Sequence, residues 1–314
     1  MKANFINKSH IEGRLYQHSL ELKVTGPNSA NPGTEFISGN IEIATDDACL
    51  NIVPVHFTYV TAITSKGKVN ATFNTLKNII DGKSSTVVTD GAENASMFRI
   101  DSAIGLNEFY TERNGKEELV SAKRNEGGFV HEVTALDADE KVRNTFETDM
   151  IITSTRMVEA DEERNLPEKL IIRGVIFDFR KSILPVEFSV LNSNAISYFE
   201  SLEPSNQNPV FTKVRGRQVS EVVVKTITEE SAFGEDYVRE VKNTRKDFVI
   251  TSAQKEPYEW DDEKTITAAE LKEAMAARET YLATVKQRQA EYKASKANPV
   301  TTTTSNVAVG GFDF

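Results

Sequence analysis

Residues able to carry out catalysis or hold a metal ion are few and scattered in this 314-residue chain. Paired carboxylates occur at Asp46-Asp47 and Asp261-Asp262, but they fit a turn and a solvated linker better than acid–base catalysis. Neither a phosphate-binding glycine loop nor a nucleophile elbow occurs. The histidines have no metal-binding spacing, and they are His10, His18, His56 and His131. We therefore predict no enzyme activity, no catalytic residue, no metal and no cofactor.

The composition is that of a folded protein in a reducing compartment. A hydrophobic fraction of 39% and an aromatic fraction of 8% are enough for two modest cores. Cys49 is the single cysteine, which excludes an intramolecular disulfide and a cysteine-rich zinc site. The sequence has neither an apolar leader nor a run of eighteen apolar residues, so we expect a cytoplasmic protein without a membrane segment.

Basic and aromatic residues interleave along several segments, and this pattern indicates a different chemistry. A nucleic-acid single strand is bound by cationic side chains along its phosphates and by aromatic faces on which its bases stack. The net charge of −10 does not oppose such binding, because the local field decides it. The candidate nucleic-acid-binding residues are Lys66, Lys68, Phe73, Phe98, Arg99, Tyr110, Lys123, Arg124, Arg173, Phe177, Phe179, Arg180, Lys181, Lys213, Arg215 and Arg217.

Alternation along the strands strengthens part of this prediction. Core packing is the ordinary role of any single aromatic residue. In an extended strand, however, Phe177 and Phe179 would face the same side as Arg173 and Lys181. A face that mixes rings and cations suits a half-exposed binding surface better than a core.

The elements that must position these residues occur twice. Residues 36–60 hold a strand with a glycine, a polar turn and a second strand, and residues 170–190 repeat the pattern. The matching features are Gly39 with Gly174, Asp46-Asp47 with Arg180-Lys181, and Pro54-Val55-His56-Phe57 with Pro185-Val186-Glu187-Phe188. Because only the second turn is basic, we expect the second copy to make the stronger contacts here, and the first copy to contribute through Lys66, Lys68 and its later loops.

The order of the predicted elements indicates a barrel. The first copy predicts strands over 11–24, 36–44 and 50–63, a helix over 72–80, and strands over 97–106 and 107–152 with turns at 114–115 and 127–128. The second predicts strands over 150–157, 169–179 and 183–191, a helix over 195–202, and strands over 211–216, 219–227 and 248–251. Three strands, a helix and further strands form the order of a five-stranded OB-type barrel. We predict a mainly β fold of two tandem OB-fold-like barrels, residues 1–140 and 141–254.

The C-terminal part has a different composition. Residues 255–297 predict an acidic linker, centred on 256–263, and then a long helix that starts at the capping box Thr267–Glu270 and the staple Ile266–Leu271. The thin apolar stripe of this helix could dock on a barrel or on a partner. Residues 298–314 predict a flexible tail ending in Phe312, Asp313 and Phe314.

Taken together, these features resemble the single-stranded DNA-binding proteins of bacteriophages and related mobile elements, in the form with tandem OB folds. The resemblance covers residues 11–251 and extends to the tail. It implies a non-enzymatic protein that coats single-stranded DNA during replication or recombination, in the host bacterial cytoplasm if the chain is phage-encoded. It also implies recruitment of replication or recombination proteins through Phe312, Asp313 and Phe314, although this tip has one aspartate where the family has a run, and no proline before the last residue.

Two other interpretations stay open at this point. One is a structural or virion protein of two β-sandwich modules with a helical arm that docks or oligomerises. The other is a nuclease or other metal-dependent enzyme. DNA binding and assembly size separate the first of these from a DNA-binding protein. If the acidic segment and tail compete with DNA for the basic groove, deletion of 255–314 should tighten binding at low salt. The oligomeric state is not predicted.

Overall fold

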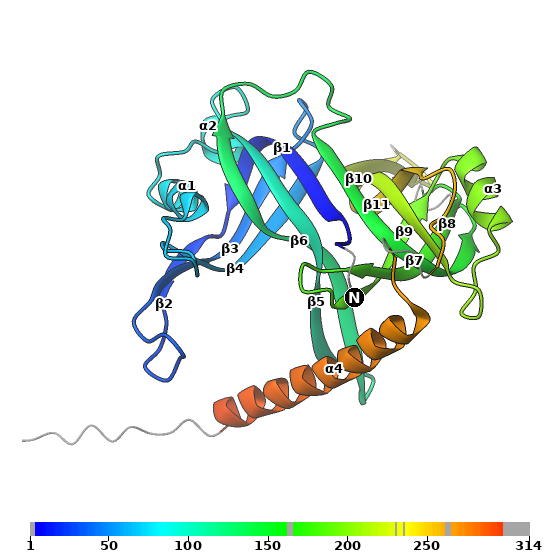
Figure 1. The fold of residues 1–314 in the computed structure, drawn as a ribbon. Coiled ribbons are helices and arrows are strands. Elements are labelled where there is room, and N and C mark those ends of the chain that lie inside the picture. Colours follow the sequence, from blue (N-terminus) through cyan, green and yellow to red (C-terminus); the bar gives the residue numbers. More distant parts are fainter. Residues whose placement is uncertain (1–3, 162–165, 230, 235, 261–264, 298–314) are drawn as a thin grey trace, which may run out of the picture.

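The protein is mainly β, as predicted. The computed structural model describes residues 4–161, 166–229, 231–234, 236–260 and 265–297 (Figure 1). Within these residues, eleven strands form one sheet in the order β10-β11-β9-β8-β7-β1-β5-β6-β4-β3-β2, with further pairings of β10 with β7 and of β1 with β3. The strands are β1 (Asn7–His18), β2 (Glu21–Val24), β3 (Glu35–Ala44), β4 (Ile52–Thr61), β5 (Met97–Arg113), β6 (Lys116–Val133), β7 (Asn144–Val158), β8 (Lys169–Phe177), β9 (Ile183–Val190), β10 (Val210–Glu229) and β11 (Tyr237–Ala253). The helices are α1 (Ala71–Ile80), α2 (Val87–Asp90), α3 (Ser193–Ser201) and α4 (Ala268–Ala297).

The two further pairings close the sheet into two barrels. In the first barrel, β1 pairs with both β3 and β5, and β4 runs parallel to β6, giving the ring β1-β3-β4-β6-β5. In the second, β7 pairs with β8 and β10, and β9 runs parallel to β11. A helix stands between the third and fourth strands of each ring, α1 in the first and α3 in the second. Each ring therefore has the OB topology, and the alternative of two β-sandwiches is wrong.

The repeated Pro-Val-x-Phe segment supplies equivalent core residues to both barrels. Val55 and Phe57 on β4 are fully buried, and so, to within a few per cent, are Val186 and Phe188 on β9. Helix α1 adds Phe73, Leu76 and Ile79 to the first core, at the spacing that places side chains on one helix face. Apolar side chains that alternate along the strands, together with those at helical spacing on α1, thus fill the interior of the first barrel.

The glycine shared by the two copies permits a close backbone approach. A Cβ atom at Gly174 would lie 2.0 Å from the carbonyl oxygen of Ile151 on the neighbouring strand, and one at Gly39 would lie 2.1 Å from that of Ser19. Any side chain at either position would force the strands apart. The glycine repeated in the sequence therefore marks, in each barrel, a position where two backbone segments approach closely.

The barrels are joined by strand pairing and by a buried amide network. Strands β1 and β7 pair antiparallel from Asn7 opposite Thr148 to Ile11 opposite Asn144. Beside this pairing, the side chains of Asn125 on β6 and Gln218 on β10 form two hydrogen bonds of 2.7 and 2.8 Å. Because both amides are buried, separating the barrels would leave donors and acceptors without partners.

The C-terminal segment completes the outside of the second barrel instead of forming a solvated linker. Ile266 is fully buried in a cluster with Phe177 and Phe211, and Phe5, Tyr258, Trp260, Leu271 and Ala274 pack against the same cluster. The prediction of an acidic linker over 256–263 is wrong for Tyr258 and Trp260; residues 261–264 lie outside the described part. Deletion of 255–314 would therefore remove core residues as well as acidic charge, so it cannot test competition with DNA.

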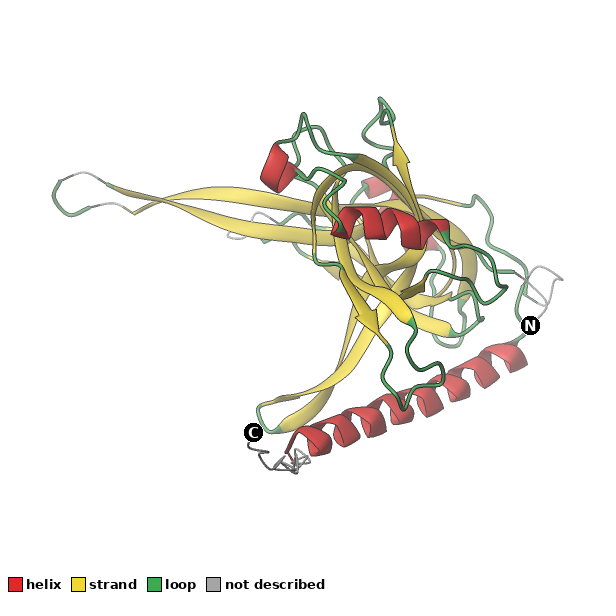
Figure 2. Ribbon diagram, turned by 90° about the vertical axis from the view of Figure 1, so that its left-hand side faces the viewer, coloured by secondary structure: helices red, strands yellow, loops and turns green. Residues whose placement is uncertain are grey.

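Helix α4 docks on its own chain. The predicted capping box is confirmed: Thr267 Oγ1 accepts from Glu270 N at 3.1 Å, and Glu270 Oε2 accepts from Thr267 N at 3.1 Å. From there the helix runs to the end of the β5–β6 hairpin, where the two lie together in Figure 2. Gln289 hydrogen-bonds both the N–H and the carbonyl of Tyr110 on β5. The helical arm is thus an internal strut between the barrels. It also supplies hydrogen-bond partners for backbone groups of Tyr110 at the edge of β5.

The single strand predicted over 11–24 is two strands, β1 and β2, and two further predictions were wrong. The turn predicted at Gly127-Gly128 is a bulge, through which β6 continues from Lys116 to Val133. The strands predicted over 211–216 and 219–227 are one strand, β10, which forms with β11 the long hairpin in Figure 2. Glycine signals a left-handed or crowded backbone in both cases, but the pairing partner decides whether the chain turns.

No helix within the described residues has the length and apolar character needed to cross a membrane.

Candidate nucleic-acid interface

A groove of about 990 Å³ lies where the first barrel, the second barrel and α4 meet. We call it groove A. Its walls are the end of β4, the middle of β5 and β6, the turn between β8 and β9, and one side of α4. It is the part of the described structure where the largest number of predicted binding residues come together, namely Arg124, Phe179, Arg180 and Lys181.

The turn between β8 and β9 is built by one aspartate. Asp178 Oδ1 accepts from the backbone N–H groups of Arg180 at 2.8 Å and Ser182 at 2.7 Å, while its carbonyl accepts from Lys181 N at 2.9 Å. Lys181 adopts a left-handed backbone with φ 65°. With the backbone fixed in this way, Phe179 is held outward with 89% of its surface exposed.

Phe179 and Arg180 form a ready-made contact unit. The guanidinium carbon of Arg180 lies 5.1 Å from the centroid of the Phe179 ring. Arg180 forms no ion pair with any residue that the structure describes. An exposed ring beside a cation that is not neutralised can bind a base and its phosphate together.

Two tyrosines complete the aromatic lining of groove A. Tyr59, at the end of β4, is 48% exposed and packs against Phe36 with ring centroids 4.7 Å apart. Tyr281 on α4 is 51% exposed. The sequence prediction missed both, since neither stands next to a basic residue along the chain. Helical spacing does offer a signal for Tyr281, because Ala274, Ala277 and Arg278 line the groove from the same face.

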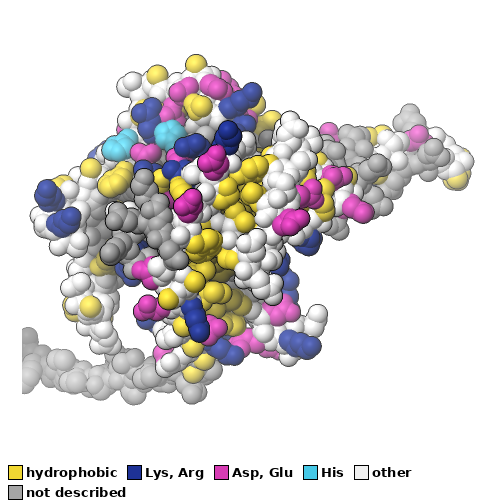
Figure 3. All heavy atoms as spheres, turned by 45° about the vertical axis from the view of Figure 1, so that its right-hand side comes forward, with side chains coloured by type: hydrophobic (Ala, Val, Ile, Leu, Met, Phe, Trp, Pro, Cys, Tyr) yellow, Lys and Arg dark blue, Asp and Glu magenta, His cyan; other side chains and the backbone are white. Residues whose placement is uncertain are grey.

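The other arginines of groove A are neutralised. Arg124 lies 2.5 Å from Glu126, and Arg278 pairs with the buried carboxylate of Glu108 while donating to the carbonyl of Ile183. Positive charge that faces solvent in the groove is therefore concentrated on the β8–β9 turn. On the face of the molecule drawn in Figure 3, Lys and Arg side chains are likewise interspersed with Asp and Glu, and hydrophobic side chains are exposed between them.

Three predicted rings are core residues and cannot stack on bases. Phe98 and Phe177 are fully buried and Phe73 is 5% exposed. Strand β8 ends at Phe177, so the alternation expected between Phe177 and Phe179 is wrong: one ring enters the outer cluster and the other projects from the turn. The sequence prediction that Phe73, Phe98 and Phe177 stack on bases is therefore wrong, because their rings are buried.

Four of the remaining predicted cations are paired with carboxylates within the protein. Arg99 lies 2.7 Å from the buried Glu12, Arg173 lies 2.6 Å from Glu187, and Lys213 and Arg215 share Glu147 at 3.5 and 3.1 Å. Arg217 differs, because its Nε is buried without a hydrogen-bond partner in the described structure. These residues lie outside groove A, and a phosphate would have to compete with a carboxylate to reach those that are paired.

Lys123 and Tyr110 have structural contacts. Lys123 reaches from β6 into the second barrel, where its Nζ lies 5.1 Å from the ring centroids of both Phe188 and Phe248 and donates to the carbonyl of Glu187. Burial lowers the pKa of Lys123 to about 8, although Asp247 and Glu187 work in the opposite direction. Tyr110 is covered by α4, with Lys286 Nζ 5.5 Å from its ring.

The last candidates fall outside the groove. Lys66 and Lys68 are exposed on the loop between β4 and α1 and do not line groove A. Phe312, Asp313 and Phe314 lie outside the described residues. Within the described part, no group of three or more His, Cys, Asp or Glu side chains is arranged to hold a metal ion.

Comparisons with known proteins give a family. A search of curated proteins found no match. Two solved structures of the single-stranded DNA binding protein from Thermus aquaticus, a deletion mutant and the wild type, are similar with TM-score 0.41 and 10% identity, covering 80% of this chain and 94% and 93% of theirs. The family model described as YorF matches residues 6–288. The chain belongs to the YorF family.

The matched residues of this YorF-family chain include every element that builds groove A. They run from before β1, through both barrels, to the part of α4 that carries Arg278 and Tyr281. The part of α4 up to residue 288 is thus covered by the family match, and it helps to shape the groove together with the barrels.

Proposed function

We propose that this protein binds single-stranded DNA without sequence preference and coats it during phage-type replication or recombination. The observation that carries the proposal is the lining of groove A. There the exposed rings of Tyr59, Phe179 and Tyr281 line the same groove as Arg180, which forms no ion pair with any described residue. Stacking rings beside a cationic contact are what a single strand needs and what a duplex, whose bases are already stacked, cannot use.

The position of groove A on the first barrel supports the same proposal. OB folds bind oligonucleotides through the face of the second and third strands and through the loops that flank it. Groove A is lined by β4, the third strand of the first barrel, and by β5 and β6, which form the hairpin of the fourth and fifth. Helix α4 and the β8–β9 turn then add an opposite wall, so the strand is held from both sides.

Each group has a distinct role in this mechanism. Phe179 and the two tyrosines stack on bases, each stack contributing about 1–3 kcal/mol, and tolerate any base because every base has a π-face. Arg180 and Lys181 contact phosphates. Each phosphate contact should contribute about −0.7 to the slope of log K against log[salt], so a small number of contacts predicts a shallow salt dependence.

Fluorescence titration of labelled dT oligomers at about 50 mM salt tests the proposal. The wild-type chain binds, and Phe179→Ala weakens binding by about tenfold, corresponding to one lost stack of about 1.4 kcal/mol. The matched control is Phe233→Ala, which removes an equally exposed ring from the β10–β11 hairpin and leaves the affinity unchanged. Absence of dT binding by the wild type would refute the function. Equal losses in both variants would refute the site.

The tail is proposed to act separately from the DNA site, by recruiting replication or recombination proteins through Phe312, Asp313 and Phe314. A chain ending at residue 297 tests the separation, because it keeps α4 and the outer cluster of the second barrel intact. We expect unchanged dT affinity and loss of protein recruitment. A changed dT affinity would instead assign the tail to DNA binding.

A further inference from the structure

A second groove, of about 770 Å³, adjoins the first along the seam between the barrels. We call it groove B. It is lined by β1, β5 and β6 from the first barrel and by β7, β10 and β11 from the second, without α4. The function proposed above does not use it.

Grooves A and B share a boundary that crosses three neighbouring strands. On β1, Asn7 lines groove A and Lys8 lines groove B; on β5, the change falls between Ala103 and Ser102. Strand β6 crosses from one to the other between Gly128 and Phe129. Ser9 on β1 lies opposite Ser102 on β5. The position on β1 where groove A gives way to groove B is therefore next to the corresponding position on β5.

On the groove A side of this boundary, β6 carries no side chain at two consecutive positions. Gly127 and Gly128 form a bulge with φ of 60° and 112°. A Cβ atom at Gly128 would lie 2.1 Å from the carbonyl oxygen of Asp101, whereas one at Gly127 would meet nothing within 4 Å. The bulge is thus a low ridge of backbone with open space above Gly127, over which an extended polymer can pass.

Groove B is also lined by an exposed ring and by a cation. Phe129 is 69% exposed, and Lys8 forms no ion pair with any residue in the described part of the chain. The hydroxyls of Ser9 and Ser102, which line the same groove, are buried without hydrogen-bond partners. Asp101 and Glu147 also line it, so its field is mixed, as in groove A.

We infer that groove B binds a second segment of the same single strand, which continues from groove A over the Gly127-Gly128 ridge. The inference rests on the proposed function. In this arrangement Phe129 stacks on a base and Lys8 contacts a phosphate. A linear polymer explains why two grooves with like chemistry share a boundary, which two separate small ligands would not require.

Two oligomer lengths separate this inference from the proposed function. The full chain is titrated with dT of about 5 nucleotides, sized for one groove, and of about 20 nucleotides, long enough to span both. Phe129→Ala should weaken the long oligomer about tenfold, equivalent to one stack, and leave the short one unchanged. Phe179→Ala should weaken both. Phe129 is exposed, so its variant should retain the wild-type melting temperature, which is measured as the folding control.

The remaining outcomes are equally decisive. Equal affinity of Phe129→Ala and wild type for the long oligomer would overturn the second segment while leaving groove A standing. Loss of both lengths in Phe129→Ala would overturn the assigned order of the grooves. Lys8→Gln gives an independent check, because it should reduce the salt slope for the long oligomer alone by about 0.7. If neither oligomer binds the wild type, the proposed function itself fails.

Discussion

The turn between β3 and β4 (residues 45–51) and the shorter turn between β8 and β9 (residues 178–182) share one local bend but carry different side chains. The carbonyl of Asp46 accepts from Cys49 N at 3.2 Å, and the carbonyl of Asp178 accepts from Lys181 N at 2.9 Å. In the first, Asp46 accepts from Leu50 N at 3.1 Å and Asn51 N at 2.8 Å, and Cys49, three residues on, has φ 55°. In the second, Asp178 accepts two backbone N–H groups, and Lys181, again three residues on, has φ 65°. The structural equivalent of Asp46 is therefore Asp178, and Asp47-Ala48 correspond to Phe179-Arg180.

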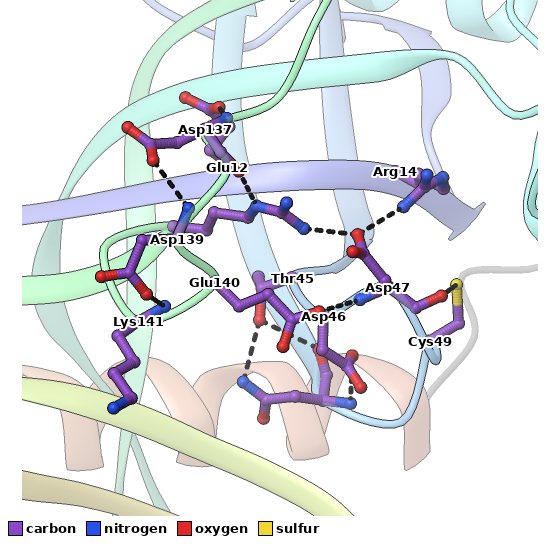
Figure 4. A network of polar contacts seen from close by, with 12 residues as sticks. Glu12, Arg14, Thr45, Asp46, Asp47, Cys49, Asp137, Asp139, Glu140 and Lys141 are labelled. Carbon is purple, nitrogen blue, oxygen red and sulfur yellow. Dashed lines mark hydrogen bonds and ion pairs between the residues drawn. The ribbon is translucent and has the colours of Figure 1, made fainter.

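The first turn is a joint, because its side chains bind other parts of the protein, including β10 of the second barrel. Asp47 binds the buried Arg143 at 2.7 Å. It also binds Arg14 at 3.2 Å, and this pair is drawn in Figure 4. Asn51 accepts from Ser220 N, on β10 of the second barrel, at 2.6 Å. In the second turn, the equivalent positions point into a groove. The bend thus holds elements together in the first barrel, whereas its equivalent in the second barrel lines groove A.

Exchanging the side chains of the two turns should have the largest effect. The double variant Phe179→Asp with Arg180→Ala gives the second turn the residues of the first, and keeps Asp178 and the backbone frame. Loss of a stack and a phosphate contact should weaken dT binding about 100-fold, near 3 kcal/mol, by fluorescence titration. Ala48→Arg is the reciprocal control. It places a cation at the same position of the first turn, outside groove A, and a gain in affinity there would contradict the comparison.

Breaking the first turn should reduce stability and leave DNA binding intact. Asn51→Ala leaves the buried N–H of Ser220 without its acceptor, at a cost of about 1–3 kcal/mol in the free energy of unfolding measured in urea. Ser182→Ala, in an exposed position of the second turn, should change it by less than about 0.5 kcal/mol. A loss of dT affinity in folded Asn51→Ala would show that the turns are not separate in function.

Acid should weaken the first turn selectively. Hydrogen bonds from Arg143 and Arg14 hold the pKa of Asp47 below its usual value of 3.8. A carboxyl with a lowered folded pKa contributes stability that is present above the unfolded value and is lost as the pH falls through the folded one. Between about pH 6 and pH 3, the urea midpoint should therefore fall further in the wild type than in Asp47→Asn. Equal falls would show that these ion pairs do not stabilise the joint.

The smallest effect should come from charge alone in the second turn. Arg180→Gln removes one phosphate contact and should make the salt slope of dT binding shallower by about 0.7, with a modest loss of affinity at low salt. Arg173→Gln is the matched control, since Glu187 already neutralises that cation 2.6 Å away. An unchanged slope in Arg180→Gln would assign this arginine to orienting Phe179.

Local patterns were sufficient to predict the barrels, because the residues that form them repeat in sequence. The glycine and the Pro-Val-x-Phe segment of each copy occupy equivalent places in each barrel. The same rule could have corrected one site prediction. Phe98 and Arg99 are adjacent in a strand and must face opposite sides, so the ring is core and the cation is outside.

The groove itself could not be predicted from local patterns. Tyr59 and Tyr281 are 222 positions apart in the numbering and meet only because α4 returns to the first barrel. The fate of Arg278, neutralised by Glu108, likewise depends on where the helix docks. Proximity along the chain predicts neighbours on one element, whereas the groove is made by elements that are distant in sequence.

The outer cluster of the second barrel has a consequence for synthesis of the protein. Phe5 stacks on Phe177 with ring centroids 4.0 Å apart, and Ile266 and Leu271 pack on the same cluster from the other end of the chain. While the chain is emerging from the ribosome, the second barrel therefore has strands but lacks part of its covering layer until Leu271 is made. A nascent chain shorter than this exposes Phe177 and Phe211, so it should be the stage at which the protein most needs a chaperone.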